Sequence, residues 1–98
     1  MTKSLKRILV TGGAKRVGKH LVERLSEAGH GVIIHANSNA ADAEQLCKQL
    51  RASNPNTWAI SADLADHAAA CALVDQAGQL AGGPLSGLVN SASVFDYD

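Results

Sequence analysis

Glycines, cations and a short apolar run lie close together near the start of the chain, in Leu5–Lys19 (LKRILVTGGAKRVGK). The run Ile8–Val10 is typical of a buried strand. Gly12 and Gly13 interrupt it, and apolar residues then recur at helical spacing from Val17 onward. A strand that turns through glycines into a helix aims the free N–H groups and the positive dipole end of that helix at one point. Because this arrangement suits a phosphate group, the stretch predicts a dinucleotide site.

The glycine spacing is not one of the two most familiar phosphate-binding patterns. It is not G-x-G-x-x-G, and His20 stands after Lys19 where a G-x-x-x-x-G-K-[ST] loop has a hydroxyl. Gly12 allows the turn to be tight, and Gly18 allows the helix to approach the strand around a pyrophosphate. Taken alone, the turn is compatible with a nucleotide site and with a purely structural connection.

The rest of the chain alternates strand and helix patterns with short connections. The expected order is βαβαβαβ, with strands at 6–11, 31–35, 57–61 and 88–90 and helices at 17–28, about 40–52, and from a cap at Asp66 to about Leu80. Such an order predicts an α/β fold with a parallel sheet covered on both faces. With dinucleotide-binding topology the sheet is Rossmann-like, has the strand order 3-2-1-4, and is incomplete on its C-terminal side.

Composition limits the classes of function. The 98 residues suffice for one domain at most, and the net charge of +0 with 18% charged residues argues against a nucleic-acid partner. We expect no membrane partner, because no apolar run approaches the roughly 18–20 residues of a membrane span. Cys47 and Cys71 fall on apolar helical faces, as does Val74, so we expect two buried free thiols and a cytoplasmic protein.

The polar and glycine-rich clusters of the chain all follow predicted strands. They are Gly12–Gly18, Ala36–Asn39, Asp63–Leu64 and Asn90–Ser93. The carboxyl ends of parallel strands lie at one edge of a sheet, where open α/β folds bind their ligands. We therefore expect all four clusters to meet at that edge.

Three of these clusters resemble motifs of one family. Thr11–Gly18 (TGGAKRVG) resembles the TGxxxGxG cofactor motif of short-chain dehydrogenases/reductases, with Arg16 in place of the middle glycine, as in the TGxxxRxG of the pteridine reductase-like group. Asp63–Leu64 matches the family's adenine-contacting position after the third strand. Asn90–Ser93 (NSAS) is similar to the family's NNAG or NNAS, although Ser91 replaces the second Asn. The resemblance runs through the whole chain and implies a nicotinamide cofactor.

The residues that follow the second predicted strand favour NADP(H) over NAD(H). NAD enzymes generally place a carboxylate there, about 20 residues after the glycine turn, to bind the ribose hydroxyls. This chain has His35–Asn39 (HANSN) instead, with no acid, and Arg16 and Lys15 are available to pair with a 2′-phosphate. His35 is placed to hydrogen-bond near the adenosine. The cofactor-binding candidates are Gly12, Lys15, Arg16, Val17, Gly18, His35, Asn37, Ser38, Asn39, Asp63, Leu64, Asn90, Ala92 and Ser93.

The resemblance also indicates what to expect for substrate and catalysis. Phe95 matches an aromatic residue that stacks on the substrate in pteridine reductases, although it is equally compatible with a loop side chain packed on the sheet edge. The family's catalytic Ser and Tyr-x-x-x-Lys lie well after the fourth strand, and Tyr97 has no Lys four residues on. We therefore assign no catalytic residue, and the histidine spacing suggests no metal site.

Two function classes follow. The first is the N-terminal part (1–98) of the dinucleotide-binding domain of a longer, homo-oligomeric reductase, inactive alone, that transfers hydride from NADPH to a pterin or another small carbonyl or imine substrate. The second is a non-catalytic nucleotide-binding or interaction module. An extended-type epimerase or reductase shares the opening turn, but Arg16 and Asn90–Ser93 count against it.

Overall fold

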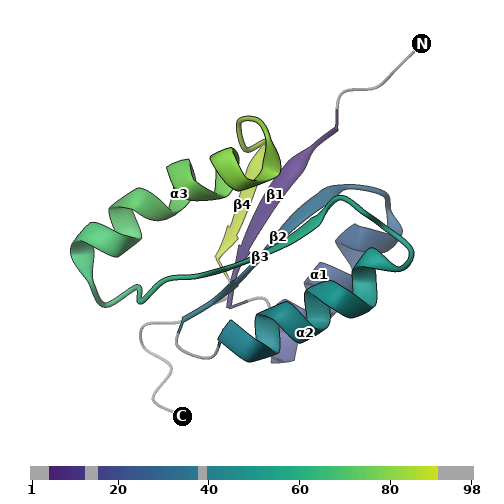
Figure 1. The fold of residues 1–98 in the computed structure, drawn as a ribbon, viewed down its shortest axis with the longest axis horizontal. Coiled ribbons are helices and arrows are strands. Elements are labelled where there is room, and N and C mark those ends of the chain that lie inside the picture. Colours follow the sequence, from purple (N-terminus) through teal and green to yellow (C-terminus); the bar gives the residue numbers. More distant parts are fainter. Residues whose placement is uncertain (1–4, 13–15, 38–39, 91–98) are drawn as a thin grey trace.

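The computed structural model describes residues 5–12, 16–37 and 40–90, with only the backbone of Arg16. Strands and helices alternate along these residues (Figure 1). They are β1 (Arg7–Thr11), α1 (Arg16–Glu27), β2 (Gly31–Ala36), α2 (Ala40–Arg51), β3 (Thr57–Ser61), α3 (His67–Ala81) and β4 (Gly87–Asn90). The predicted element order is confirmed, and the predicted bounds agree with the observed ones to within one residue.

The strands form one parallel sheet in the order β3-β2-β1-β4. The register pairs Val10 with Ile34 and Thr11 with Asn90, so the strands end close to one another. The predicted Rossmann-like strand order is therefore confirmed. All four carboxyl ends lie along one edge of the sheet, which we call the carboxyl edge, and the opposite side is the amino edge.

Helices cover both faces of the sheet, α1 and α2 on one and α3 on the other (Figure 1). On the first face Val10 and Ile34 pack with Val22 of α1 and with α2, whereas Leu9 and Ile33 belong to the cluster under α3. Alternate residues of each strand thus face opposite layers. This explains why every residue of β2 is buried, as its continuous apolar sequence predicts.

The caps of α3 are set by local sequence. The Asp66 carboxylate accepts hydrogen bonds from the backbone N–H groups of Ala68 and Ala69, which confirms the predicted cap. At the other end Gly82 has a φ of +81°, in the left-handed region that ends many helices. The two ends of α3 are therefore determined by the capping residues Asp66 and Gly82.

The buried face of α3 differs from the prediction at two positions. Leu73, Ala77 and Ala81 point into the sheet at intervals of four residues, so Val74 is 46% exposed. Cys71, expected to be buried, is also exposed. Alanines and other apolar residues of α3 occupy every face of the helix, so the sequence pattern does not show which face is buried. Cys47 on α2 is a buried free thiol as predicted, and it donates a hydrogen bond to the Thr57 carbonyl at 3.3 Å.

A buried asparagine links the connections at the amino edge. Asn54 lies between α2 and β3, and its Nδ2 donates to the carbonyls of Ser26 (3.2 Å) and His30 (2.9 Å). Its Oδ1 accepts from the Asn56 N–H, and its backbone carbonyl accepts from the Thr57 hydroxyl at 2.8 Å. One side chain thus ties the α1–β2 connection to the α2–β3 connection.

Arg7 ties the other half of the amino edge together. Its Nε donates to the Ala81 carbonyl at 3.0 Å, at the end of α3. Its backbone N–H donates to the Ser86 hydroxyl, and its carbonyl accepts from the Ser86 N–H. A Cβ atom at Gly83 would lie about 2.8 Å from the guanidinium, so a larger residue there would require the Arg7 side chain to shift.

Among the described helices, none has the length and apolar composition to cross a membrane.

Candidate functional site

The glycine turn begins directly at the end of β1. Gly12 has a φ of +65°, a conformation that costs other residues roughly 1 kcal/mol or more. The first turn of α1 starts at Arg16, and within it Gly18 is buried while Val17 is 68% exposed. The N-terminus of α1 and its free N–H groups therefore lie at the carboxyl edge, as expected for an anion site.

His35, near the end of β2, lies directly beneath this turn. Its side chain is fully buried, with 0% exposed surface. The Gly12 N–H donates to Nδ1 at 3.1 Å, and Nε2 lies 2.8 Å from the Ala62 carbonyl. The imidazole therefore joins the ends of β1, β2 and β3 and has both ring nitrogens bonded to main chain. The role of direct contact with a cofactor, predicted for His35, stays a prediction.

A second link joins the segments that follow β2 and β3. The Oδ1 of Asn37 accepts a hydrogen bond from the Leu64 N–H at 2.8 Å. The Oδ1 of Asp63 accepts a hydrogen bond from the Ala65 N–H at 2.9 Å, which stabilises the bend before α3. Asn37 and Asp63 are exposed. Both residues follow strands whose ends lie at the carboxyl edge, where a ligand is expected.

A third link joins β1 to β4. The Thr11 hydroxyl donates to Oδ1 of Asn90 at 2.8 Å, and the two residues are directly paired in the parallel register. Thr11 is buried and Asn90 is exposed. The bond orients the Asn90 amide, whose exposed position lies at the expected switch point between β1 and β4.

The structure brings some of the predicted residues together and leaves others undescribed. Gly12 contacts His35, and Asn37 contacts Leu64, while Asp63 and Asn90 lie on the same edge. The side chain of Arg16 is not described. The candidates that lie outside the described residues are Lys15, Ser38, Asn39, Ala92, Ser93 and Phe95.

Two features of the site were missed by the sequence analysis. One is the His35 link to Gly12 and Ala62, and the other is the orienting role of Thr11 toward Asn90. A signal existed for the first, because a polar residue inside a fully apolar strand needs buried hydrogen-bond partners. The second depends on the register of β1 and β4, which pairs residues 79 positions apart.

Comparison with known proteins decides the family. Residues 6–97 match the sequence profile of short chain dehydrogenase. The chain belongs to the short-chain dehydrogenase family. The match includes every described element, and so the glycine turn, the bend after β3 and the end of β4 occupy positions that this family shares.

Individual relatives refine the comparison. The chain is 39% identical over 92 residues to the short chain dehydrogenase/reductase dpchG of Colletotrichum higginsianum, covering 93% of this chain and 33% of that protein. It is 43% identical over 63 residues to pteridine reductase 1 of Leishmania tarentolae, covering 63% and 22%. The chain therefore spans a third or less of these two curated relatives.

A solved structure matches the fold closely. The FolM alternative dihydrofolate reductase 1 of Brucella suis, in complex with NADP, superposes with a TM-score of 0.83 at 39% identity, over 95% of this chain and 38% of that one. The Rossmann-like architecture is thus shared with a reductase whose structure was solved in complex with NADP.

The groups at the end of β2 and at the N-terminus of α1 are compatible with a dinucleotide that carries an extra 2′-phosphate. The end of β2 carries His35, Ala36 and Asn37, and none of them is a carboxylate that would repel a 2′-phosphate. The N-terminus of α1 supplies N–H groups and a positive dipole end. The described end of β2 therefore carries no negative charge that would repel an extra phosphate.

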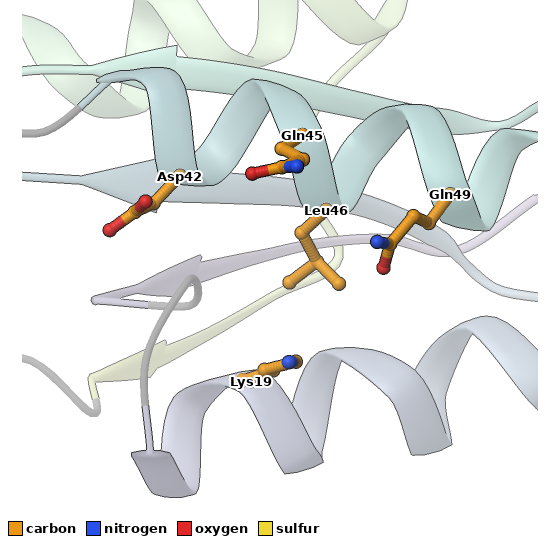
Figure 2. Close-up of a pocket in the computed structure, with 5 residues that line it drawn as sticks. All are labelled: Lys19, Asp42, Gln45, Leu46 and Gln49. Atoms are coloured by element: carbon orange, nitrogen blue, oxygen red, sulfur yellow. The ribbon is translucent and has the colours of Figure 1, made fainter.

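A hollow of about 220 Å³ lies elsewhere, between α1 and α2, where Leu46 points from α2 toward α1 (Figure 2). Leu46 is the only buried residue of its lining, and the others are Lys19, Asp42, Gln45 and Gln49. None of the predicted site residues that the structure describes lines this hollow. The carboxyl edge therefore remains the candidate site.

Proposed function

We propose that residues 1–98 form the N-terminal part of the dinucleotide-binding domain of an NADPH-dependent short-chain reductase. The observation that carries the proposal is the combination, at one edge of the sheet, of the glycine turn after β1 with an end of β2 that lacks an acid. An acid at this position would select for NAD(H) by binding the ribose hydroxyls and repelling a 2′-phosphate. The NADP in the Brucella suis structure supports the same cofactor.

Each cluster of the carboxyl edge has a part in this proposal. The N-terminus of α1 holds the pyrophosphate, and Arg16 with Lys15 pairs with the 2′-phosphate. Asp63 and Leu64 flank the adenine, and Asn90 lies toward the nicotinamide half of the cofactor. Bound NADPH supplies the hydride that reduces the substrate.

The substrate that we propose for the whole protein is a pterin or another small carbonyl or imine compound. The identity of 43% to pteridine reductase 1 over 63 residues supports the pterin, as does the Arg16 variant of the glycine motif. Phe95 is the proposed stacking residue. The resemblance to the family also supports a homo-oligomer, and the two free thiols support a reducing compartment such as the cytoplasm.

The cofactor proposal is tested by titrating NADPH and NADH into the protein, its Arg16→Ala variant and an Arg24→Ala control. Arg24 is an exposed cation in the last turn of the same helix, so its loss changes the net charge equally but at the amino edge. Loss of a charge-assisted contact should weaken NADPH binding by about 10- to 100-fold in Arg16→Ala. NADH binding should stay nearly constant, and Arg24→Ala should behave as the parent.

Several outcomes would count against the proposal. Equal affinity for NADPH and NADH, or an equal loss in Arg16→Ala and Arg24→Ala, would contradict a 2′-phosphate site at Arg16. NADPH binding by the full protein without consumption of NADPH in the presence of a pterin or a simple ketone would favour the non-catalytic nucleotide-binding module.

A further inference from the structure

The imidazole of His35 is the only fully buried titratable side chain among the described residues at the carboxyl edge. The proposed function assigns it no contact with substrate and no catalytic role. Its two ring nitrogens contact two different main-chain segments, the glycine turn at Gly12 and the Ala62 carbonyl just after β3. A buried polar ring with two specific contacts determines the positions of both segments relative to β2.

The chemistry of the two partners defines the protonation of the ring. A carbonyl oxygen can only accept, so Nε2 must carry the proton that bonds to Ala62 at 2.8 Å. The Gly12 N–H can only donate, so Nδ1 must be the unprotonated acceptor at 3.1 Å. The arrangement is therefore satisfied by one neutral form of the imidazole, the Nε2–H tautomer.

We propose that His35, in this tautomer, is a positioning residue that holds the start of the glycine turn in its cofactor-binding conformation. The effect on cofactor binding rests on the proposed function, whereas the tautomer and the Gly12 bond do not. Since the Gly12 N–H points inward to His35, it is not a donor to the pyrophosphate. The pyrophosphate therefore needs other donors, and in this proposal His35 acts on the cofactor only through the turn.

Two conservative substitutions separate the two contacts of the ring. In His35→Asn, the amide oxygen lies near the former Nδ1 position and can accept from Gly12, but the side chain is too short to reach Ala62. In His35→Gln, the amide nitrogen lies near the former Nε2 position and can donate to Ala62, but the Gly12 bond is lost. Each variant loses one buried hydrogen bond, so we expect similar losses of stability from both.

The first experiment observes the contacts directly in the full protein, with ¹⁵N-labelled histidine and glycine. The His35 nitrogens should show the Nε2–H tautomer by NMR. The Gly12 amide should exchange slowly with solvent in the parent and in His35→Asn, and at least about tenfold faster in His35→Gln, where its acceptor is gone. A Nδ1–H tautomer, or equal exchange in both variants, would overturn the proposal.

The second experiment titrates NADPH into the same proteins. His35→Gln should bind NADPH about tenfold more weakly than the parent, and His35→Asn within about threefold of it, although their unfolding midpoints fall alike. A purely structural role predicts instead that affinity follows stability, so equal affinity losses would refute positioning. If the parent does not bind NADPH, the proposed function fails, and the tautomer and the Gly12 exchange still decide whether His35 holds the turn.

Discussion

The two edges of the sheet use polar residues in opposite ways. At the amino edge Asn54 is buried, and its amide makes three hydrogen bonds, all to main-chain groups of neighbouring connections. At the carboxyl edge Asn37 and Asn90 are exposed, and the Oδ1 of each accepts a hydrogen bond, from the Leu64 N–H and the Thr11 hydroxyl respectively. The same residue type therefore closes one edge and lies open to solvent at the other.

This difference separates residues that stabilise the fold from residues that are available to a ligand. In the described part of the chain, every buried side-chain nitrogen and oxygen has a hydrogen-bond partner. Removing a partner at the amino edge leaves buried groups unpaired, which costs stability. Removing an exposed amide at the carboxyl edge costs little stability, so its effect should be seen in binding.

The largest expected effect is from the same substitution made at both edges. Asn54→Asp removes the two N–H donors to Ser26 and His30 and places a carboxylate against their carbonyl oxygens. We expect the free energy of unfolding to fall by about 3 kcal/mol, measured by urea denaturation. NADPH affinity of the remaining folded protein should not change.

Asn37→Asp is the matched control at the carboxyl edge. Its Oδ1 still accepts from Leu64, so the free energy of unfolding should change by about 0.5 kcal/mol or less. The new carboxylate at the end of β2 should instead shift the cofactor preference from NADPH toward NADH. If Asn37→Asp destabilises the protein as much as Asn54→Asp does, the contrast between the two edges is wrong.

A smaller effect is expected from two buried threonines, one at each edge. Thr57 donates to the Asn54 carbonyl at the amino edge, and Thr11 donates to the Asn90 side chain at the carboxyl edge, both at 2.8 Å. Replacing either by Val keeps the shape and removes the hydroxyl, at a cost of about 1 kcal/mol each in urea unfolding. Only Thr11→Val should also weaken NADPH binding, by a few-fold, because Asn90 loses its orienting bond. Equal binding in the two variants would remove Thr11 from the site.

The smallest effect concerns pH and the buried thiol near the amino edge. Burial, which outweighs the nearby Arg51, raises the pKa of Cys47 above its ordinary value. The unfolded chain therefore loses this proton at a lower pH than the native chain does. Stability from this group is complete below the unfolded pKa and is lost as the pH rises toward the native pKa, by at most about 1.4 kcal/mol per pH unit.

The measurement is urea unfolding from pH 7 to pH 10 for the parent and Cys47→Ser. The serine keeps a donor for the Thr57 carbonyl and does not titrate. The difference in the free energy of unfolding between the parent and Cys47→Ser should therefore shrink as the pH rises. A difference that is constant with pH would contradict the raised pKa of Cys47.

Features set by local sequence could be predicted. The Asp66 cap, the continuous burial of β2 and the helix stop before Gly29, whose φ is +87°, depend on residues close together in the chain. The grouping of Gly12, Asn37, Asp63 and Asn90 at one edge follows from the strand order and the parallel pairing. Their roles toward a cofactor stay predictions.

Features set by distant pairs could not be predicted. The Asn54 side chain bonds to residues 24 and 28 positions away, and the His35 ring bonds to residues 23 and 27 positions away. Such pairs depend on the exact register of the strands, which a list of expected elements leaves open. The exposure of Val74 and Cys71 was missed for another reason, because alanines make the faces of α3 alike.

The central position of β1 has a consequence for protein synthesis. β1 is made first and pairs with β2 soon afterwards, but its other neighbour, β4, begins only at residue 87. At a translation rate of roughly 5–20 residues per second, the side of β1 that pairs with β4 stays without its partner strand for several seconds after β2 is complete. We expect the growing chain to form β1, β2 and β3 as an early unit, and Arg7 to close the sheet when Ala81 and Ser86 leave the ribosome. During that interval, the open side of β1 is the part of the nascent chain that most needs a chaperone.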